Sequence, residues 1–107
     1  MKPLMSSNIF KKGAREAFVS VVIPVYRDEK GLRDTLESLG TQSLRRDRFE
    51  IIVGNDGGDA AISAACAAYG VRHIAVLPRQ GSYGARNAAL AESEGEFIAF
   101  VDADITV

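Results

Sequence analysis

The sequence is poor in the residues that build the most common metal and redox sites. Its 107 residues include one cysteine, Cys66, and one histidine, His73. A single cysteine excludes an internal disulfide and suits a reducing compartment, and a single histidine excludes the usual histidine-bearing zinc spacings. A metal bound by this chain would therefore be a hard ion that is held by carboxylates.

An excess of charge of one sign is missing too. Thirteen Lys and Arg residues face 14 Asp and Glu residues, which leaves a formal net charge of -1 and a pI of about 5.8. This balance is not typical of a protein that binds nucleic acid over its whole surface, so we expect no nucleic-acid partner. A bound anion would need a local site.

Long hydrophobic runs are absent from the first residues. The stretch "MKPLMSSNIFKKGAREAF" has neither the apolar core of a signal peptide nor the length of a membrane span. We expect residues 1–17 to form a leader that is partly disordered, and we expect no membrane span in this chain.

What is present is the composition and the alternation of an α/β domain. Hydrophobic residues make up 47% of the chain and charged residues 25%, which are ordinary values for one small globular domain. From Phe18 on, β-branched runs alternate with helical segments. This pattern predicts strands at 18–26, 49–54, 71–77 and 96–104 and helices at 28–43, 59–70 and 83–95. The short links between them indicate βαβ units, and hence a Rossmann-like parallel sheet with flanking helices.

Polar residues follow three of the predicted strands. Parallel sheets bind ligands at the carboxyl ends of their strands, near the point where the strand order reverses. With a strand order of 3-2-1-4, three groups would line one crevice: Tyr26, Arg27 and Asp28; Asn55 and Asp56; and Asp102 and Asp104.

The pair Asp102 and Asp104 ends the fourth predicted strand. In extended backbone both carboxylates point to one side, with Ala103 opposite, and they repel each other unless a cation or hydrogen bonds offset their charge. A divalent metal would do so, with water and diphosphate oxygens as its other ligands. The alternative is that both residues only form a turn, and for the pair alone that alternative is favoured.

The stretch "VGNDGGD" predicts a tight turn through residues 55–58. A carboxylate in this turn can accept a hydrogen bond from an imide N–H, such as that of uracil. The alternative is a plain strand-to-helix turn that ends in the helix cap Asp59.

The stretch "RQGSYGARNAAL" brings Arg79 and Arg86 close to a helix start. Backbone N–H groups and the helix dipole favour anions there, so a diphosphate or the edge of a base is a candidate ligand. The alternative is a loop arginine and a helix-surface arginine that are both solvated.

Taken together, three stretches resemble the nucleotide-binding half of family 2 glycosyltransferases with the GT-A fold. They are "VSVVIPVYRDEKGLRDTLESLGTQS", "EIIVGNDGGD" and "GSYGARNAALAESEGEFIAFVDAD", and the resemblance runs from about Val19 to Asp104. It implies inverting transfer of a sugar from a nucleotide-diphosphate donor, a UDP sugar, to a saccharide or lipid-linked acceptor. It also implies a divalent metal, Mg²⁺ or Mn²⁺, and a place in polysaccharide biosynthesis.

The resemblance implies roles for single residues. Asp104, the last acid of the family's D-x-D motif, resembles the metal ligand, and Asp102 resembles the contact to the ribose side of the nucleotide and a second metal ligand. Asp56 resembles the aspartate that reads the base. The resemblance places a packing loop under the nucleoside at Pro24, Val25 and Tyr26.

Three further positions carry implied nucleotide contacts. Asp28 stands near the acidic position that follows the nucleoside loop, and Arg86 belongs to the family's Ala-Arg-Asn stretch. Either Arg79 or Arg86 is expected to face the nucleotide. The chain departs from the family pattern at two positions, because Asn55 stands where an aspartate is common and Gly58 where a serine is frequent.

The residues that would complete such an enzyme are expected beyond Val107. In the family the general base lies well downstream of the D-x-D motif, so we expect the chain to be truncated after its fourth strand, with residues 18–107 as the donor-binding half. Alone it would lack the acceptor site and the base and would be inactive. In the full-length protein we expect a cytoplasmic location, at the inner face of the membrane. The donor sugar, the acceptor and the oligomeric state are left open.

Other readings remain. A nucleotidyltransferase or a dinucleotide-binding oxidoreductase would show a glycine-rich loop directly after the first strand, where this chain has "IPVYRDEKG". A receiver-like signalling domain would carry an acid after the third strand, where "HIAVLPRQG" has none. A non-catalytic fragment that folds poorly is the remaining alternative.

Overall fold

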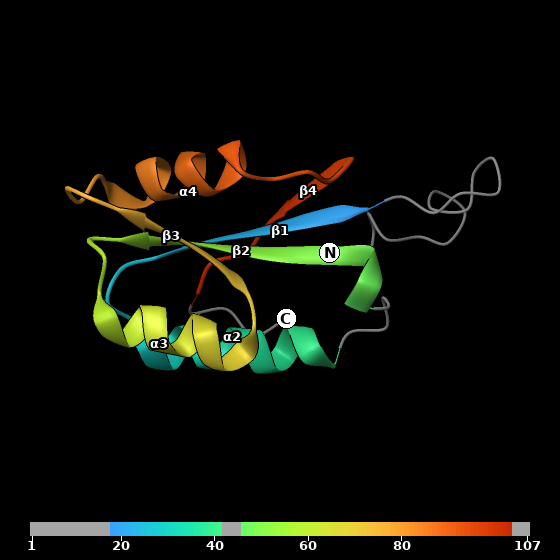
Figure 1. The fold of residues 1–107 in the computed structure, drawn as a ribbon, viewed down its shortest axis with the longest axis horizontal. Helices are drawn as coiled ribbons and strands as arrows, with labels where there is room; N and C mark the ends of the chain where they lie inside the picture. Colours follow the sequence, from blue (N-terminus) through green and yellow to red (C-terminus); the bar gives the residue numbers. More distant parts are fainter. Residues whose placement is uncertain (1–17, 42–45, 104–107) are drawn as a thin grey trace, which may run out of the picture.

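The protein is a three-layer α/β domain. The computed structural model describes residues 18–41 and 46–103. A four-stranded parallel sheet has the order β3-β2-β1-β4, as the sequence predicts. Two helices, α2 and α3, cover one face of the sheet and α4 covers the other (Figure 1). The elements are β1 (Val19–Val25), α2 (Glu29–Gly40), the short 3-10 helix η3 (Arg46–Arg48), β2 (Phe49–Asp56), α3 (Ala60–Tyr69), β3 (Arg72–Val76), α4 (Gly81–Ala91) and β4 (Phe97–Phe100).

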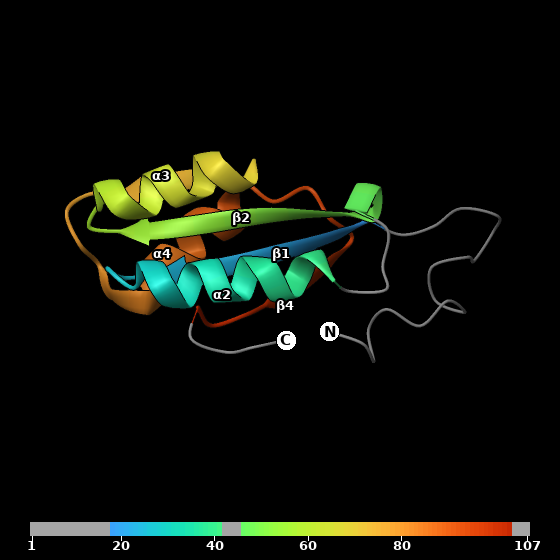
Figure 2. The same cartoon turned by 90° about the horizontal axis from the view of Figure 1, so that it is seen from below.

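The two-sided burial of β1 follows from its run of β-branched residues. All seven residues of the strand are buried. Because side chains alternate between the faces of a strand, Val19, Val21, Ile23 and Val25 pack with α2 and α3 in the larger core cluster. Val22 packs on the opposite face with Ala89 of α4. A strand that is buried on both faces is held firmly in the sheet, and its carboxyl end lies at the same end of the sheet as that of β2 (Figure 2).

Helix boundaries on the α2 and α3 face agree with the caps read from the sequence. The carboxylate of Asp28 accepts a hydrogen bond from the N–H of Gly31 at 2.9 Å, and that of Asp59 accepts one from Ala61 at 2.9 Å. Helix α3 ends at Tyr69 and is followed by Gly70 in the left-handed conformation. Side-chain oxygens thus satisfy N–H groups that the first turn of each helix leaves without a partner.

Pro24 lies inside β1 and does not interrupt it. The carbonyl of Val22 accepts a hydrogen bond from Val101, so residues 22 and 24 both turn their backbone toward β4. The pairing of β1 with β4 ends at Val22 and Phe100. An N–H at position 24 would lie beyond the last paired residues of β1 and β4. Proline at this position therefore removes no hydrogen bond from the pairing of the two strands.

Several element ends differ from the prediction. Strand β2 continues through Asn55 and Asp56 and overlaps the predicted turn, which is confirmed: the N–H of Gly58 donates a hydrogen bond to the carbonyl of Asn55 at 3.1 Å. Helix α4 begins at Gly81, two residues earlier than predicted, and β4 ends at Phe100. The predicted leader, residues 1–17, lies outside the described residues, as does the predicted end of the first helix at 42–43.

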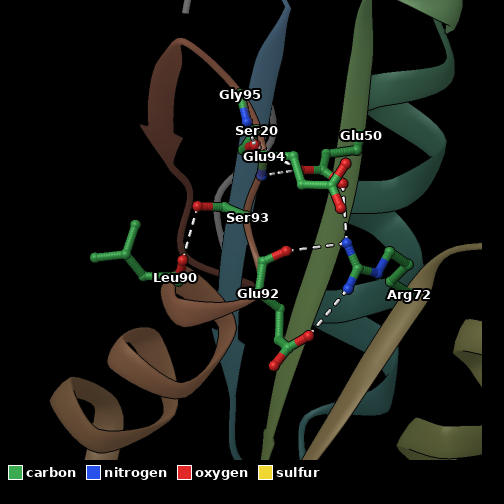
Figure 3. A network of polar contacts seen from close by, with 8 residues as sticks. All are labelled: Ser20, Glu50, Arg72, Leu90, Glu92, Ser93, Glu94 and Gly95. Carbon is green, nitrogen blue, oxygen red and sulfur yellow. Dashed lines mark hydrogen bonds and ion pairs between the residues drawn. The ribbon is translucent and has the colours of Figure 1, made fainter.

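The amino ends of the strands are joined by a polar network (Figure 3). The carboxylate of Glu50 accepts hydrogen bonds from the hydroxyl of Ser20 at 2.6 Å, the N–H of Glu94 at 2.8 Å and the guanidinium of Arg72 at 3.1 Å. Burial alone would raise the pKa of Glu50, but these hydrogen bonds outweigh it and hold the pKa below its usual value. Ser20 in turn accepts the N–H of Gly95 at 2.7 Å. The network therefore ties β1, β2, β3 and the turn before β4 together at the edge opposite the polar crevice.

Among the described residues, none of the helices is both long enough and apolar enough to span a bilayer.

Candidate functional site

A pocket lies at the carboxyl ends of β1, β2 and β3, where the sequence predicts the crevice. Its volume is about 460 Å³. It is lined by Tyr26, Arg27, Asp56, Gly57, Asp59, Leu77 and Arg79. Two of the three predicted polar groups, those after the first and second strands, thus contribute to one cavity. Asp102 of the third group does not line it, and Asp104 lies outside the described residues.

Asp56 is the buried acid of this pocket. It is 1% exposed, yet its carboxylate has partners: Oδ1 accepts the N–H of Gln80 at 2.8 Å and Oδ2 accepts the N–H of Gly81 at 2.9 Å. Gln80 caps α4 without a side-chain hydrogen bond of its own. Asp56 therefore acts as the cap of α4 from 24 residues away, and its charge lies at the positive end of that helix. No pattern in the sequence predicts this contact between residues 24 and 25 positions apart.

Tyr26 presents its ring to the pocket between two arginines. The ring is partly exposed, and the guanidinium carbon of Arg79 lies 3.8 Å from its centroid, which is a close cation–π stack. Nε of Arg79 also lies 3.5 Å from the Asp56 carboxylate. Arg27 is farther from the ring, at 6.0 Å, and has a φ of 56°. A left-handed φ is strained for a residue with a Cβ, and such strain is concentrated at functional sites.

Hydrogen bonds from the side chain of Asn55 hold the turn that follows β2. The fully buried Asn55 accepts the N–H of Asp59 at 3.1 Å and donates to its carbonyl at 2.9 Å, so the amide spans the turn. The turn itself needs glycine, because Gly57 and Gly58 have φ values of 89° and 69°. This geometry gives the departure from the family pattern a structural role: an amide both donates and accepts here, whereas an ionised aspartate only accepts.

Arg86 lies apart from the pocket, on the side of α4 that faces β4. Its guanidinium carbon is 4.9 Å from the centroid of the Phe100 ring and 5.2 Å from that of Tyr83. Its Nε is buried and has no hydrogen-bond partner among the described residues. Of the two arginines that the sequence left as alternatives, Arg79 is the one that lines the pocket.

The remaining predicted residues take varied positions. Pro24 and Val25 are buried in β1, beneath the pocket, and Tyr26 alone of this stretch is exposed. Asp28 is half-buried and caps α2. Its nucleotide contact stays a prediction. Arg27 lines the pocket, as the sequence predicts for the group after the first strand, although the resemblance implies no ligand contact for it.

The acidic tip after β4 is described only in part. Asp102 is exposed and Ala103 is buried, which matches the alternation expected for this stretch. Asp104 lies outside the described residues, which contain no cluster of three or more His, Cys, Asp or Glu side chains suited to a metal. The exposed carboxylate of Asp102 nevertheless supplies the hard oxygen donor that Mg²⁺ and Mn²⁺ prefer, so the residue fits a divalent metal.

Comparisons with known proteins point to one family. The model of "Glycosyl transferase family 2" matches residues 20–107. The glycosyltransferase AglE of Haloferax volcanii is 29% identical over 92 residues, which are 81% of this chain and 30% of AglE. TarS of Staphylococcus aureus, a poly(ribitol-phosphate) beta-N-acetylglucosaminyltransferase, is 32% identical over 79% of this chain and 16% of its own length.

Solved structures agree on the fold. TarS residues 1–349 in complex with UDP superpose with a TM-score of 0.70 and 30% identity, over 81% of this chain and 27% of that chain. A mannosyltransferase of Pyrobaculum calidifontis in complex with GDP-Man and Mn²⁺ has a TM-score of 0.76 and 23% identity, over 82% and 28%. The chain thus spans less than a third of the length of these relatives.

Proposed function

The chain belongs to glycosyl transferase family 2, whose model matches residues 20–107, and from that premise we propose that it binds the nucleoside diphosphate of a UDP sugar. The whole protein would transfer that sugar, with inversion, to a saccharide or lipid-linked acceptor. The observation that carries the proposal is the pocket of about 460 Å³ in which an aromatic ring, a buried carboxylate and a guanidinium converge. The UDP complex of TarS, at 30% identity, supports a uridine nucleotide.

Base recognition would depend on Asp56. Each carboxylate oxygen has two lone pairs, and each uses one for a backbone N–H of residue 80 or 81. The remaining lone pairs can accept the imide N–H of uracil. Cytosine has no hydrogen at the corresponding ring nitrogen, so the same carboxylate would meet an acceptor and repel it.

The flat surface for the base would come from Tyr26 and Arg79. Guanidinium planes stack on aromatic rings and on nucleobases, so Arg79 extends the surface that the ring offers. Two arginines at the pocket also supply positive charge for the diphosphate. Pro24 and Val25 would support this surface from within β1.

The diphosphate and the metal would lie toward the acidic tip. Strand β4 pairs with β1, so Asp102 follows the strand next to the one that carries Tyr26. Asp102 and Asp104 would hold Mg²⁺ or Mn²⁺, and a bound divalent metal would neutralise the charge that grows on the diphosphate as the sugar leaves. The mannosyltransferase complex contains Mn²⁺, but at 23% identity it supports the fold alone. The metal proposal therefore rests on the two carboxylates.

Calorimetric titration tests the proposal. The purified chain is titrated with UDP and with CDP, each with and without Mn²⁺, after circular dichroism has shown that it is folded. We expect UDP to bind about tenfold more tightly than CDP, the effect of one mismatched hydrogen bond. Mn²⁺ should strengthen UDP binding, and Asp104→Ala should remove that gain.

Asp34→Ala is the matched control, because Asp34 is an exposed acid on α2 that pairs with Lys30 outside the pocket. It should bind like the unchanged chain. Equal affinity for UDP and CDP would contradict base reading by Asp56, and absence of UDP binding by a folded chain would overturn the donor site as a whole.

A further inference from the structure

Thr35 links α2 to the acidic tip. It lies in the middle of α2 and is fully buried, and its hydroxyl donates a hydrogen bond to the carbonyl oxygen of Ala103 at 2.5 Å. The two residues are 68 positions apart in the sequence. Ala103 is the middle residue of the stretch Asp102-Ala103-Asp104, so the contact reaches the motif between its two acids.

The contact between Thr35 and Ala103 lies just beyond the end of the pairing between β1 and β4. The register of β1 with β4 ends at Phe100, and the N–H of Val101 makes the last bond, to the carbonyl of Val22. Beyond that point the ladder no longer fixes the backbone. Ala103 is 7% exposed and its side chain belongs to the core cluster that α2 shares with β1. A carbonyl in this position is cut off from water and needs a donor, which the Thr35 hydroxyl supplies.

The same bond constrains the backbone at Ala103, next to Asp102. A peptide group is planar, and the plane that holds the Ala103 carbonyl also holds the nitrogen of the next residue. One hydroxyl therefore orients this plane, while the buried methyl group of Ala103 anchors it to the core and Asp102 is left exposed. Two carboxylates can share one metal only when their spacing is held, because metal affinity depends on ligand geometry.

Helix α2 carries this constraint to the pocket as well. Its cap, Asp28, follows directly after Tyr26 and Arg27, two residues that line the pocket. One rigid helix is thus fixed at its start beside the base surface and, two turns later, at the acidic tip. Helix α2 therefore connects the backbone beside the pocket with the backbone of the acidic tip at Ala103.

We propose that Thr35 is a positioning residue for the acidic tip, holding the backbone of Ala103, next to Asp102, through the Ala103 carbonyl. The inference rests on the proposed function for the role of the two carboxylates, but its geometric part stands on the described contact alone. Thr35 is fully buried and does not line the pocket. Its removal should therefore change the order of the tip and the effect of the metal, and leave base binding intact.

The test compares three variants with the unchanged chain. Thr35→Val keeps the shape and removes the hydroxyl, and Thr35→Ser keeps the hydroxyl. Thr41→Val is the control at the end of the same helix, since Thr41 directly follows α2 and its hydroxyl donates locally, to the carbonyl of Ser38 at 2.8 Å. If Thr35→Val does not fold by circular dichroism, Thr35→Ala takes its place.

The first measurement needs no ligand. Amide hydrogen exchange is followed in peptides that cover residues 100–107, relative to a peptide from β1 that reports global unfolding. We expect exchange at least threefold faster in Thr35→Val, and rates like those of the unchanged chain in Thr35→Ser and Thr41→Val. Equal relative rates in all four proteins would overturn the proposal.

The second measurement separates this inference from the proposed function. In titrations with UDP, the increase in affinity that Mn²⁺ provides should be about tenfold smaller for Thr35→Val than for the unchanged chain. The UDP affinity of the two proteins without metal should differ by no more than about twofold. A full Mn²⁺ gain in Thr35→Val would overturn the link to the metal. Absence of UDP binding by the unchanged chain would contradict the proposed donor site. The exchange rates would still decide whether Thr35 orders the backbone of the tip.

Discussion

The side-chain amide of Asn55 donates a hydrogen bond to Nε2 of His73, with 2.9 Å between the two nitrogens. Asp59 fixes the orientation of the Asn55 amide, because the amide oxygen accepts the N–H of Asp59 and the amide nitrogen donates to the Asp59 carbonyl. The amide nitrogen therefore faces His73 as a donor. Nε2 must then carry no proton, so His73 is neutral in the folded chain. Burial adds to this and lowers the pKa of His73.

Stability should therefore decline as the solution becomes acidic. Because the folded chain holds the pKa of His73 below its ordinary 6.5, the unfolded chain takes up the proton first. The contribution is complete above pH 6.5 and is lost as the pH falls toward the lowered pKa. His73→Gln keeps an acceptor and does not titrate, so its thermal midpoint should fall less between pH 7 and about pH 5. Identical slopes for both proteins would contradict this account.

The hydrogen bonds of Glu50 predict a second loss of stability, at a lower pH than the loss caused by His73. Glu50→Gln should lower the free energy of unfolding by about 2 kcal/mol at pH 7, since a carboxylate that is 14% exposed loses charged hydrogen bonds to Ser20 and Arg72. The folded chain holds the pKa of Glu50 below 4.5, so this contribution is complete above pH 4.5 and is lost as the pH falls through the lowered pKa. The difference in the free energy of unfolding between the unchanged chain and Glu50→Gln should therefore become smaller as the pH falls below 4.5.

Urea unfolding at pH 7 and at pH 3 measures both parts of that prediction. Glu92→Gln is the control, because Glu92 contacts the same Arg72 at 3.3 Å but is 51% exposed. Its removal should change stability by no more than about 0.5 kcal/mol. A control that costs as much as Glu50→Gln would show that Arg72, and not Glu50, is the centre of the network.

The packing of α4 on the sheet predicts a strict need for glycine at position 54. A Cβ at Gly54 would overlap the backbone carbonyl of Ala85, whose carbon would lie 2.9 Å away. Backbone cannot move aside as a side chain can, so Gly54→Ala should cost about 3 kcal/mol. Gly40→Ala is the control, since a Cβ there meets nothing within 4 Å. Chemical denaturation of both variants should separate them clearly, and a neutral Gly54→Ala would mean that α4 lies farther from β2.

Cys66 should be protected from thiol reagents until the chain unfolds. It is buried in α3, and burial raises the pKa of its thiol to about 11. At pH 8 this shift from 9.0 lowers the thiolate fraction by about a hundredfold, on top of the steric protection. Labelling with a chromogenic disulfide should thus be slow in buffer and should rise with urea in step with unfolding. Fast labelling of the folded chain would place the thiol at the surface.

Much of the fold could be predicted because its signals are local. The caps Asp28 and Asp59 stand beside the helices that they begin, and the buried character of β1 is visible in its own composition. The strand order also follows from the rules for βαβ units. These features need no knowledge of what lies across the domain.

The details of the site could not be predicted, because they join residues that are far apart in the sequence. Thr35 looks like an ordinary polar position on an amphipathic helix until its contact with Ala103 is seen. The bonds from Asp56 to the start of α4 are equally invisible, and they extend the helix two residues beyond its predicted start. Periodicity reports which face of an element is buried but not which distant backbone group it meets.

The strand order also fixes when each part of the site can assemble during synthesis. The partner of β1 on one side, β2, follows after about 30 residues, whereas the turn before β4 contacts Ser20 across 75. A chain grows from its amino end, so all residues that line the pocket have been made before β4 exists. Until then β1 has one open edge, to which another strand can add. The pocket can thus form early and the stretch after β4 comes later, and in the interval between them a ribosome-bound chain exposes an edge of β1 to wrong pairing.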